Sequence, residues 1–363
     1  MSGILFEPCR IGNLELRNRF VRSATWDATA DTAGKVTDTS VAFYKRLGEG
    51  SIGLIVSGYA FVSAYGQAIH GQYGVHHNDM IPGLSRLARA VHEGGGKIAL
   101  QIVHAGINSG YLVQEGVTLA AVSERSGVKR PHREMTDEDI EGIIGDFAAA
   151  AVRAREAGFD AVQLHGAHGY LMSQFISPLF NQRTDRWGGN PENRRRFHTE
   201  VVRRVRQAVG PDFPFFIKFG VMDDQEGGLF LEEGVEAAQQ MAATGIDAIE
   251  VSGGVGQGAY QTQEGEPVMT PFRERASAVK QAVDVPVILV GGIRSLETAQ
   301  DIVNSGDANM VSMCRPFIRE PHLVARWQGG ETAPAACITC NKCMAIVRRG
   351  EPLECGNIRV TPD

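Results

Sequence analysis

The 363-residue chain has no long hydrophobic run, since no apolar stretch approaches the roughly 18 residues that a membrane span requires. Its first twenty residues carry charges throughout and lack an apolar segment, so we expect neither a signal peptide nor a membrane anchor, and a cytoplasmic location. Positive charge is not in excess, because the formal net charge is −6. The sequence therefore gives no electrostatic basis for binding nucleic acid or an anionic membrane.

Cysteine is scarce through most of the chain. Cys9 and Cys314 stand alone, and the other four of the six cysteines lie near the C-terminus, at Cys337, Cys340, Cys343 and Cys355. In a chain expected in the cytoplasm, such a cluster indicates a metal site rather than disulfides.

A glycine-rich dinucleotide fingerprint is also missing. The first apolar run is followed by SATWDATAD, which excludes the G-x-G-x-x-G turn of an open doubly wound sheet. Several of the apolar runs, such as VPVILVGG, are nearly all apolar, as expected for strands buried on both faces. Eight such runs alternate with helical patterns, at residues 20–25, 53–62, 97–104, 161–168, 214–220, 248–254, 285–293 and 309–317. This order predicts an α/β protein, a (β/α)8 barrel over residues 1–330 with right-handed crossovers.

Local signals support this arrangement. Thr136 with Asp139 and Asn190 with Pro191 predict two helix starts, and further helices are expected at 232–243 and 295–304. Residues 1–19 are expected to form a hairpin that closes the bottom of the barrel. The 105–135 connection is too long for a simple loop and predicts a lid over the C-terminal face. Residues 331–363 form a short cysteine-rich tail.

The active site of such a barrel lies at the C-terminal ends of its strands. Gly291 and Gly292 follow the seventh run and Arg315 ends the eighth, and together they predict a phosphate site. Glycine allows backbone N–H groups to approach an anion, and a guanidinium binds phosphate through two parallel donors. A tight turn and a surface ion pair are the alternative interpretation.

Lys218 lies inside the apolar segment FPFFIKFG. Because an unpaired buried ammonium is costly, this lysine needs a partner. It either faces the barrel mouth, where it would stabilise negative charge on a bound ligand, or forms a salt bridge with a carboxylate such as Glu250. A Schiff-base lysine in a phosphate-binding lyase is a further alternative.

His165 and His168 are three residues apart, which on a regular strand places their side chains on opposite faces. Gly166 and Gly169 allow the chain to bend, so both rings can converge and polarise a carbonyl oxygen. Tyr170 lies two residues further and is a candidate proton donor. The spacing alone is equally compatible with a metal pair or with two packed histidines.

The segment GFDAVQLHGAHGYLMSQFISPLFNQRTDRWGGNPENRRRF, residues 158–197, resembles the Old Yellow Enzyme family of FMN-dependent oxidoreductases. LELRNRFVRSA, QIVHAG, VGGI and RPFIREPHL match in the same order, so the likeness extends to about residue 327. It implies a barrel that binds FMN, takes hydride from NADH or NADPH and passes it to the C=C bond of an α,β-unsaturated carbonyl compound.

The resemblance also implies roles for individual residues. His165 and His168 are expected to bind the substrate oxygen, and Tyr170 is expected to protonate the α-carbon. Trp26 stands where many relatives have threonine or cysteine beside the flavin, so it is expected either to narrow the pocket or to pack under the lid. The implied FMN contacts are Ser23, Ala24, Thr25, Gly58, Gln101, Lys218, Gly292, Cys314 and Arg315.

The tail sequence CITCNKCMAIVRRGEPLEC is similar to the [4Fe–4S] segment of trimethylamine dehydrogenase and 2,4-dienoyl-CoA reductase, with spacing that differs by about one residue. Four thiolates suit iron–sulfur or zinc, and free thiols are the third alternative. Those larger proteins continue beyond the cluster, whereas this sequence ends at Asp363, so a separate redox protein is the expected electron donor to a cluster. A homo-oligomer is expected from the same resemblance, and a non-catalytic metal or redox sensor is the remaining alternative.

Overall fold

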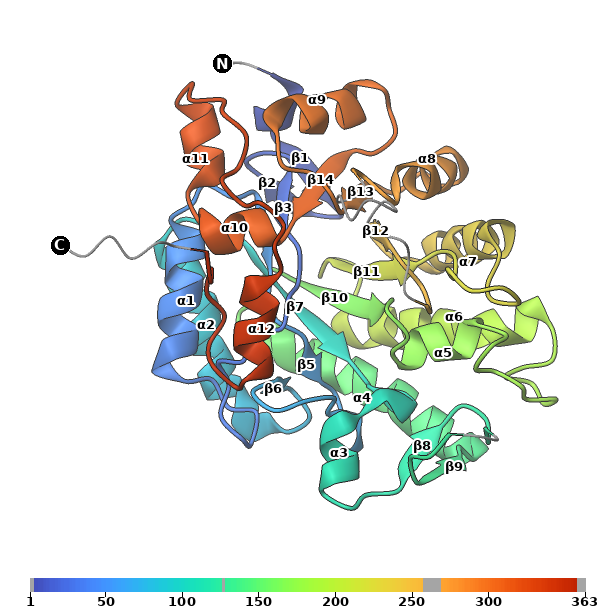
Figure 1. The fold of residues 1–363 in the computed structure, drawn as a ribbon. Coiled ribbons are helices and arrows are strands. Elements are labelled where there is room, and N and C mark those ends of the chain that lie inside the picture. Colours follow the sequence, from blue (N-terminus) through green and yellow to red (C-terminus); the bar gives the residue numbers. More distant parts are fainter. Residues whose placement is uncertain (1–2, 126–127, 257–268, 358–363) are drawn as a thin grey trace.

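The computed structural model describes residues 3–125, 128–256 and 269–357, and its centre is a closed barrel of eight parallel strands (Figure 1). The ring closes because the first and last of these strands pair with each other, and β7 pairs with β10. The barrel strands in ring order are β3 (Phe20–Arg22), β4 (Leu54–Val56), β7 (Ile98–Val103), β10 (Ala161–Gly166), β11 (Phe215–Gly220), β12 (Ile249–Ser252), β13 (Val287–Val290) and β14 (Met310–Met313). The predicted (β/α)8 barrel is confirmed.

Helices follow the strands and surround the barrel (Figure 1). The main ones are α1 (Asp38–Gly48), α2 (Ile81–Glu93), α4 (Asp137–Glu156), α6 (Pro191–Val209), α7 (Leu231–Thr244), α8 (Arg273–Ala282), α9 (Leu296–Asn304), α10 (Arg315–Arg319) and α11 (Leu323–Gln328). Shorter turns are η1 (Ile4–Phe6), η2 (Ala64–Gly66), η3 (Asn78–Met80) and α5 (Leu171–Ile176). Both predicted helix starts are confirmed, because Thr136 forms a capping box with Asp139, and Asn190 caps α6 ahead of Pro191.

Two predicted strands have different limits in the structure. The run 53–62 divides into β4 and β5 (Ala60–Phe61), and β5 pairs with both β7 and β6 (Tyr73–Gly74). The run 309–317 was predicted as one strand, but the strand ends at Met313 and α10 begins at Arg315. Pro316 favours this helix start, since proline lacks the N–H that a first turn leaves unpaired.

An N-terminal hairpin closes the bottom of the barrel, as predicted. β1 (Cys9–Ile11) pairs antiparallel with β2 (Leu14–Leu16) around Gly12, which has a φ of 52°. A side chain at this glycine would meet the Asp247 carboxylate at 2.9 Å. Ile11 and Leu16 are fully buried and pack against inward side chains of the strands, including Val21.

The 105–135 segment has secondary structure of its own: η4 (Gly106–Asn108), α3 (Gly110–Gln114), β8 (Leu119–Ala121) and β9 (His132–Glu134). Arg183 donates to the carbonyl oxygens of Val122 and Met135, both at 2.8 Å, and so holds the two sides of the segment together. Asn108 Nδ2 donates to Gly169 O at 2.7 Å. The structure therefore places the start of this segment beside the end of β10, at the edge of the barrel mouth.

The tail returns to the C-terminal face of the barrel. It contains α12 (Lys342–Arg348), which is drawn in red in Figure 1. Ala335 N donates to Arg294 O at 2.7 Å, and Leu353 N donates to Asp27 O at 2.9 Å. None of the helices within the described ranges is long and apolar enough to cross a membrane.

We expect Leu16→Ala to lower the free energy of unfolding by about 2–5 kcal/mol, because it removes a fully buried side chain from the N-terminal hairpin. Glu15→Ala is the matched control on the same strand, since Glu15 is exposed and its ion pair with Arg10 is a surface pair. Urea unfolding followed by circular dichroism checks this. Equal midpoints for the two variants would contradict a hairpin that packs against the bottom of the barrel.

Candidate active site

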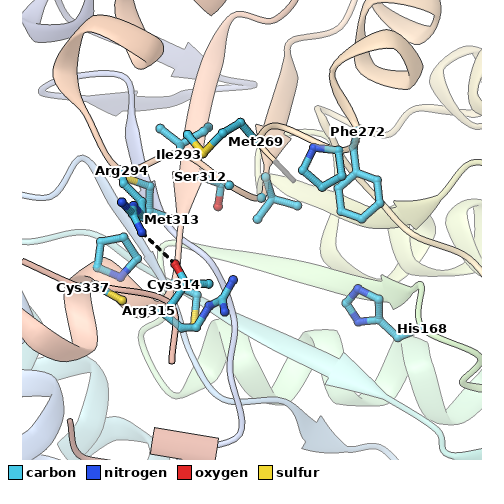
Figure 2. Close-up of a pocket in the computed structure, with 16 residues that line it drawn as sticks. His168, Met269, Phe272, Ile293, Arg294, Ser312, Met313, Cys314, Arg315 and Cys337 are labelled. Carbon is cyan, nitrogen blue, oxygen red and sulfur yellow. Dashed lines mark hydrogen bonds between the residues drawn. The ribbon is translucent and has the colours of Figure 1, made fainter. Parts of the chain in front are cut away.

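A cavity of about 270 Å³ opens where β13 and β14 end; we call it the β13–β14 cavity. It gathers five residues that the sequence singled out for this end of the barrel: His168, Gly291, Gly292, Cys314 and Arg315. Figure 2 shows Arg294, Arg315 and Cys337 on one side of the cavity and His168 on the other. The cavity therefore joins the predicted phosphate residues to one of the two predicted substrate-binding histidines.

Gly291, Gly292 and Arg315 line this cavity, and the guanidinium of Arg315 carries a positive charge. Gly291 and Gly292 have φ values of 105° and 72°, which side chains rarely allow. Arg315 Nη1 donates to the amide oxygen of Asn341 at 2.7 Å. Because this partner is a neutral amide, the contact does not neutralise the charge of the guanidinium. A left-handed glycine pair beside a guanidinium has the chemistry that a phosphate group requires.

Arg294 is a second cation in the cavity, and the sequence analysis missed it. Its Nη1 donates to Thr339 Oγ1 at 3.2 Å, and its Nε is buried without a hydrogen-bond partner in the described part of the chain. A buried charged donor without a partner is costly, so this position favours an anionic ligand. The signal was present in the sequence, because Arg294 follows the Gly291-Gly292 pair by two residues.

A buried ion pair lies inside the barrel, among inward-facing side chains of β11 and β12. Lys218 Nζ is 2.7 Å from Glu250 Oε1, and the two side chains are 3% and 0% exposed. Ser23 Oγ accepts from Lys218 Nζ at 2.8 Å and donates to Glu250 Oε1 at 2.9 Å. The salt bridge that the sequence analysis gave as an alternative for Lys218 is thus present, and it includes the predicted flavin contact Ser23.

The same carboxylate organises a pair of glutamines. Gln163 Nε2 donates to Glu250 Oε2 at 2.6 Å, and Gln101 Nε2 donates to Gln163 Oε1 at 2.6 Å. Burial disfavours the Glu250 carboxylate, but the Lys218 ammonium and these hydrogen bonds outweigh burial and lower its pKa. The chain of contacts fixes the orientation of the Gln101 amide, which is a predicted flavin contact.

His165 near the end of β10 and His168 and Tyr170 just after it come together, as predicted, but Gly166 stays in the strand and does not make the bend. The ring of His165 lies 5.2 Å from that of His168 and 5.1 Å from that of Tyr170, measured between centroids. The bend is made by His168 and Gly169, which have φ values of 60° and 74°. His168 Nε2 is 2.8 Å from Ser252 Oγ, and His165 Nδ1 is buried without a partner within the described residues.

Burial sets the protonation of this cluster. It lowers the pKa of His165 well below its ordinary value, with further contributions from His168 and Lys218. Burial, with the Lys218 charge, lowers the pKa of His168 to about 4. Burial also raises the pKa of Tyr170, whose hydroxyl donates to Tyr59 Oη at 3.3 Å. At neutral pH the histidines are therefore neutral and the tyrosine keeps its proton.

The remaining predicted flavin contacts lie around these groups. Thr25 Oγ1 contacts Cys314 Sγ, which joins the end of β3 to the end of β14. Gly58 directs its backbone N–H to Tyr44 Oη, so its contact with a ligand would be made by other atoms. Trp26 Nε1 donates to His70 O at 3.1 Å, and its indole lines a separate cavity of about 580 Å³ together with Tyr170. Ala24 is partly buried and packs against the hydrophobic cluster at the barrel centre.

The four tail cysteines line one small cavity of about 20 Å³, which also includes Arg315 and Asn341; we call it the cysteine cavity. None of the four forms a disulfide with another cysteine of the described ranges. Across residues 3–125, 128–256 and 269–357, no three histidine, cysteine or acidic side chains are placed to hold a metal ion. Burial raises the pKa of both Cys337 and Cys343.

The (β/α)8 barrel and the residues at its mouth agree with what comparison with known proteins shows. Residues 4–333 match the model of the NADH:flavin oxidoreductase / NADH oxidase family. The chain is similar to an NADH oxidase of Thermoanaerobacter brockii, with 36% identity over 342 residues, covering 93% of this chain and 52% of that protein. It therefore spans about half the length of this relative.

Solved structures show the same relationship. A 2-naphthoyl-CoA reductase in complex with 2-naphthoyl-CoA superposes with a TM-score of 0.88 at 28% identity, covering 97% of this chain and 56% of that one. An old yellow enzyme homologue from Zymomonas mobilis gives a TM-score of 0.78 at 26% identity, covering 91% and 94%. The chain belongs to the NADH:flavin oxidoreductase / NADH oxidase family, so the Old Yellow Enzyme resemblance is confirmed. This membership counts against the lyase and non-catalytic alternatives.

We expect Lys218→Met to lower the free energy of unfolding by about 3–5 kcal/mol at pH 8, because it leaves the Glu250 charge buried without its cation. In the wild type the folded pKa of Glu250 is lowered, so its stabilisation is present above the unfolded value of about 4.3 and is lost as the pH falls. In the variant unopposed burial raises that pKa, so the penalty grows as the pH rises. Urea midpoints at pH 5 and pH 8 measure the difference.

The control for this pair is the double variant Lys218→Met with Glu250→Gln, which removes the unpaired charge. We expect it to recover much of the stability at pH 8. A loss from Lys218→Met that is equal at both pH values, and unchanged in the double variant, would show that the ion pair is not the cause.

Proposed function

We propose that this chain binds FMN across the barrel mouth and reduces the activated C=C bond of an α,β-unsaturated carbonyl compound with hydride from NADH or NADPH. The observation that best supports this proposal is that His168 lines the β13–β14 cavity while its ring centroid lies 5.2 Å from that of His165. A phosphate-type site and a set of carbonyl-polarising side chains therefore share one mouth. Family membership and the likeness to an old yellow enzyme homologue support the flavin.

The residues present fit FMN at both ends. Arg294 and Arg315 would hold the phosphate. The backbone N–H groups of Gly291 and Gly292 would approach it at the same point. Ser23, Gln101 and Lys218 would face the ring, with Ala24, Thr25, Gly58 and Cys314 beside it. The chemistry that FMN would supply when bound is hydride transfer from the nicotinamide to the alkene.

The chain's own residues then deal with the oxygen and the proton. The unpaired Nδ1 of His165, together with His168, would hydrogen-bond the substrate carbonyl oxygen and stabilise the negative charge that develops there. Neutral imidazoles serve this purpose without losing a proton to the oxygen. The Tyr170 hydroxyl would donate a proton to the α-carbon, since its raised pKa keeps it protonated.

We also propose that Cys337, Cys340, Cys343 and Cys355 bind a [4Fe–4S] cluster, with zinc as the alternative. The support is chemical and positional, because four thiols line one cavity and thiolates suit either occupant. Among the described residues these thiols are not placed to hold a metal ion, so the proposal depends on their number and chemistry. With a cluster present, a separate redox protein is an alternative electron donor. For the assembly of this chain, we propose a homo-oligomer.

The absorption spectrum of the chain purified without oxygen tests this proposal. We expect flavin bands, a broad brown shoulder if the cluster is present, and rapid bleaching of the flavin bands by NADH or NADPH in stopped flow. A colourless protein would refute the proposal. Flavin bands that neither nicotinamide bleaches would favour the separate redox donor.

Tyr170→Phe isolates the protonation step. We expect bleaching by the nicotinamide to be unchanged, while recovery of the flavin bands with a neutral enone slows by about 10²–10⁴-fold, the range for a general acid. Trp26→Phe is the matched aromatic control, since Trp26 lines the same cavity as Tyr170 but is not part of the histidine–tyrosine cluster. Equal slowing of both half-reactions by Tyr170→Phe would contradict the assigned role.

The histidine pair predicts the pH dependence. Because the folded pKa of His168 is about 4, this ring stays neutral from about pH 5.5 upward, and burial shifts the pKa of His165 in the same direction. We therefore expect kcat/KM for enone reduction to show no loss of activity between pH 7.5 and pH 5.5. An acid limb centred near 6.5, the ordinary histidine value, would show that these imidazoles are solvated and that the proposed environment is wrong.

A further inference from the structure

The tail loop from Cys337 to Asn341 forms part of the wall of the β13–β14 cavity. Cys337 lines this cavity together with Arg294 and Arg315 (Figure 2). Thr339 lines it as well. The backbone bond from Ala335 N to Arg294 O, 2.7 Å long, brings the tail alongside the turn after β13. The segment that the sequence marked only by its cysteines therefore reaches both arginines of the proposed phosphate site.

Two side chains of this loop hold the two guanidiniums. Asn341 Oδ1 accepts from Arg315 Nη1 at 2.7 Å, and Thr339 Oγ1 accepts from Arg294 Nη1 at 3.2 Å. A guanidinium has five N–H donors, so each arginine is anchored through one donor and retains others for a ligand.

The backbone of the loop is held in an unusual conformation at the two anchoring residues. Thr339 and Asn341 have φ values of 61° and 57°, in the left-handed region, which is especially unfavourable for β-branched threonine. Such conformations persist where surrounding contacts hold them, and they gather at functional sites. Both residues flank Cys340, and Arg315 borders the cysteine cavity as well as the β13–β14 cavity. Cys337 of the loop also borders both cavities, so the loop and Arg315 together separate one cavity from the other.

We propose that Thr339 and Asn341 are positioning residues for the flavin phosphate, so that the cysteine tail is part of the FMN site. This rests on the proposed function in taking the FMN phosphate as the anion. A guanidinium binds phosphate with two parallel donors only when its plane is correctly oriented. Fixing the Arg294 and Arg315 planes in advance reduces the ordering cost of binding.

Riboflavin separates positioning from general structure, because it carries the same ring as FMN without the phosphate. The full chain, stripped of flavin, is titrated with each compound, and fluorescence quenching gives the two dissociation constants. We expect the wild type to bind FMN more tightly than riboflavin. Asn341→Gly removes the acceptor while suiting the left-handed backbone, and Thr339→Val removes the hydroxyl while keeping the shape. Each is expected to raise the dissociation constant for FMN by about tenfold and to leave that for riboflavin unchanged.

Two variants in the same loop are the controls. Thr339→Ser keeps the hydroxyl and should retain wild-type preference for FMN. Ile338→Ala removes an exposed side chain that has no hydrogen-bonding group, and should behave in the same way. Circular dichroism confirms that each variant is folded, and the two independent anchors guard against a failure of one variant to fold.

The outcomes are distinct. Selective weakening of FMN by both Asn341→Gly and Thr339→Val supports the proposal. Unchanged FMN binding, or equal loss of FMN and riboflavin, overturns it while leaving the flavin function intact. A wild-type chain that binds neither flavin would instead refute the proposed function itself.

Discussion

The buried carboxylate of Glu250 is the interaction on which the centre of the barrel depends. It accepts from Lys218 on β11, from Ser23 at the end of β3, and from Gln163 on β10. Each of those donors would be costly to bury alone, and the carboxylate would be costly without them. Because the contacts reach three different strands, they fix the inward-facing polar groups relative to one another. The orientation of Gln101 follows from the same carboxylate through Gln163.

Closure of the barrel brings the rest of the mouth into place around this network. His165 lies near the end of β10 and His168 just after it, the glycine pair follows β13, and Arg315 follows β14. These segments are more than a hundred residues apart in sequence, yet His168 and Arg315 line one cavity. The long 105–135 segment and the tail then border the mouth from outside. The mouth is thus assembled from the ends of several strands, as this fold requires.

The tail shows that a clear sequence signal can leave other contacts of the same segment unpredicted. Its cysteine spacing was the visible signal, whereas Thr339 and Asn341 looked like ordinary polar residues of a loop. Their contacts with Arg294 and Arg315 depend on where the tail folds back, which no local pattern specifies. The strand prediction for 309–317 failed for a related reason. An apolar run alone does not distinguish a strand from the buried first turn of a helix, and here the run contains both.

The sequence by itself determined the alternation of strands and helices, the hairpin at the bottom, and most polar residues at the strand ends. It did so because buried parallel strands leave continuous apolar runs, and because helix caps and glycine turns act locally. Only the tertiary structure decided the partner of Lys218, the convergence of His165 with His168, the inclusion of Arg294, and the position of the tail. These are contacts between residues distant in the chain, and they depend on which strands become neighbours when the ring closes.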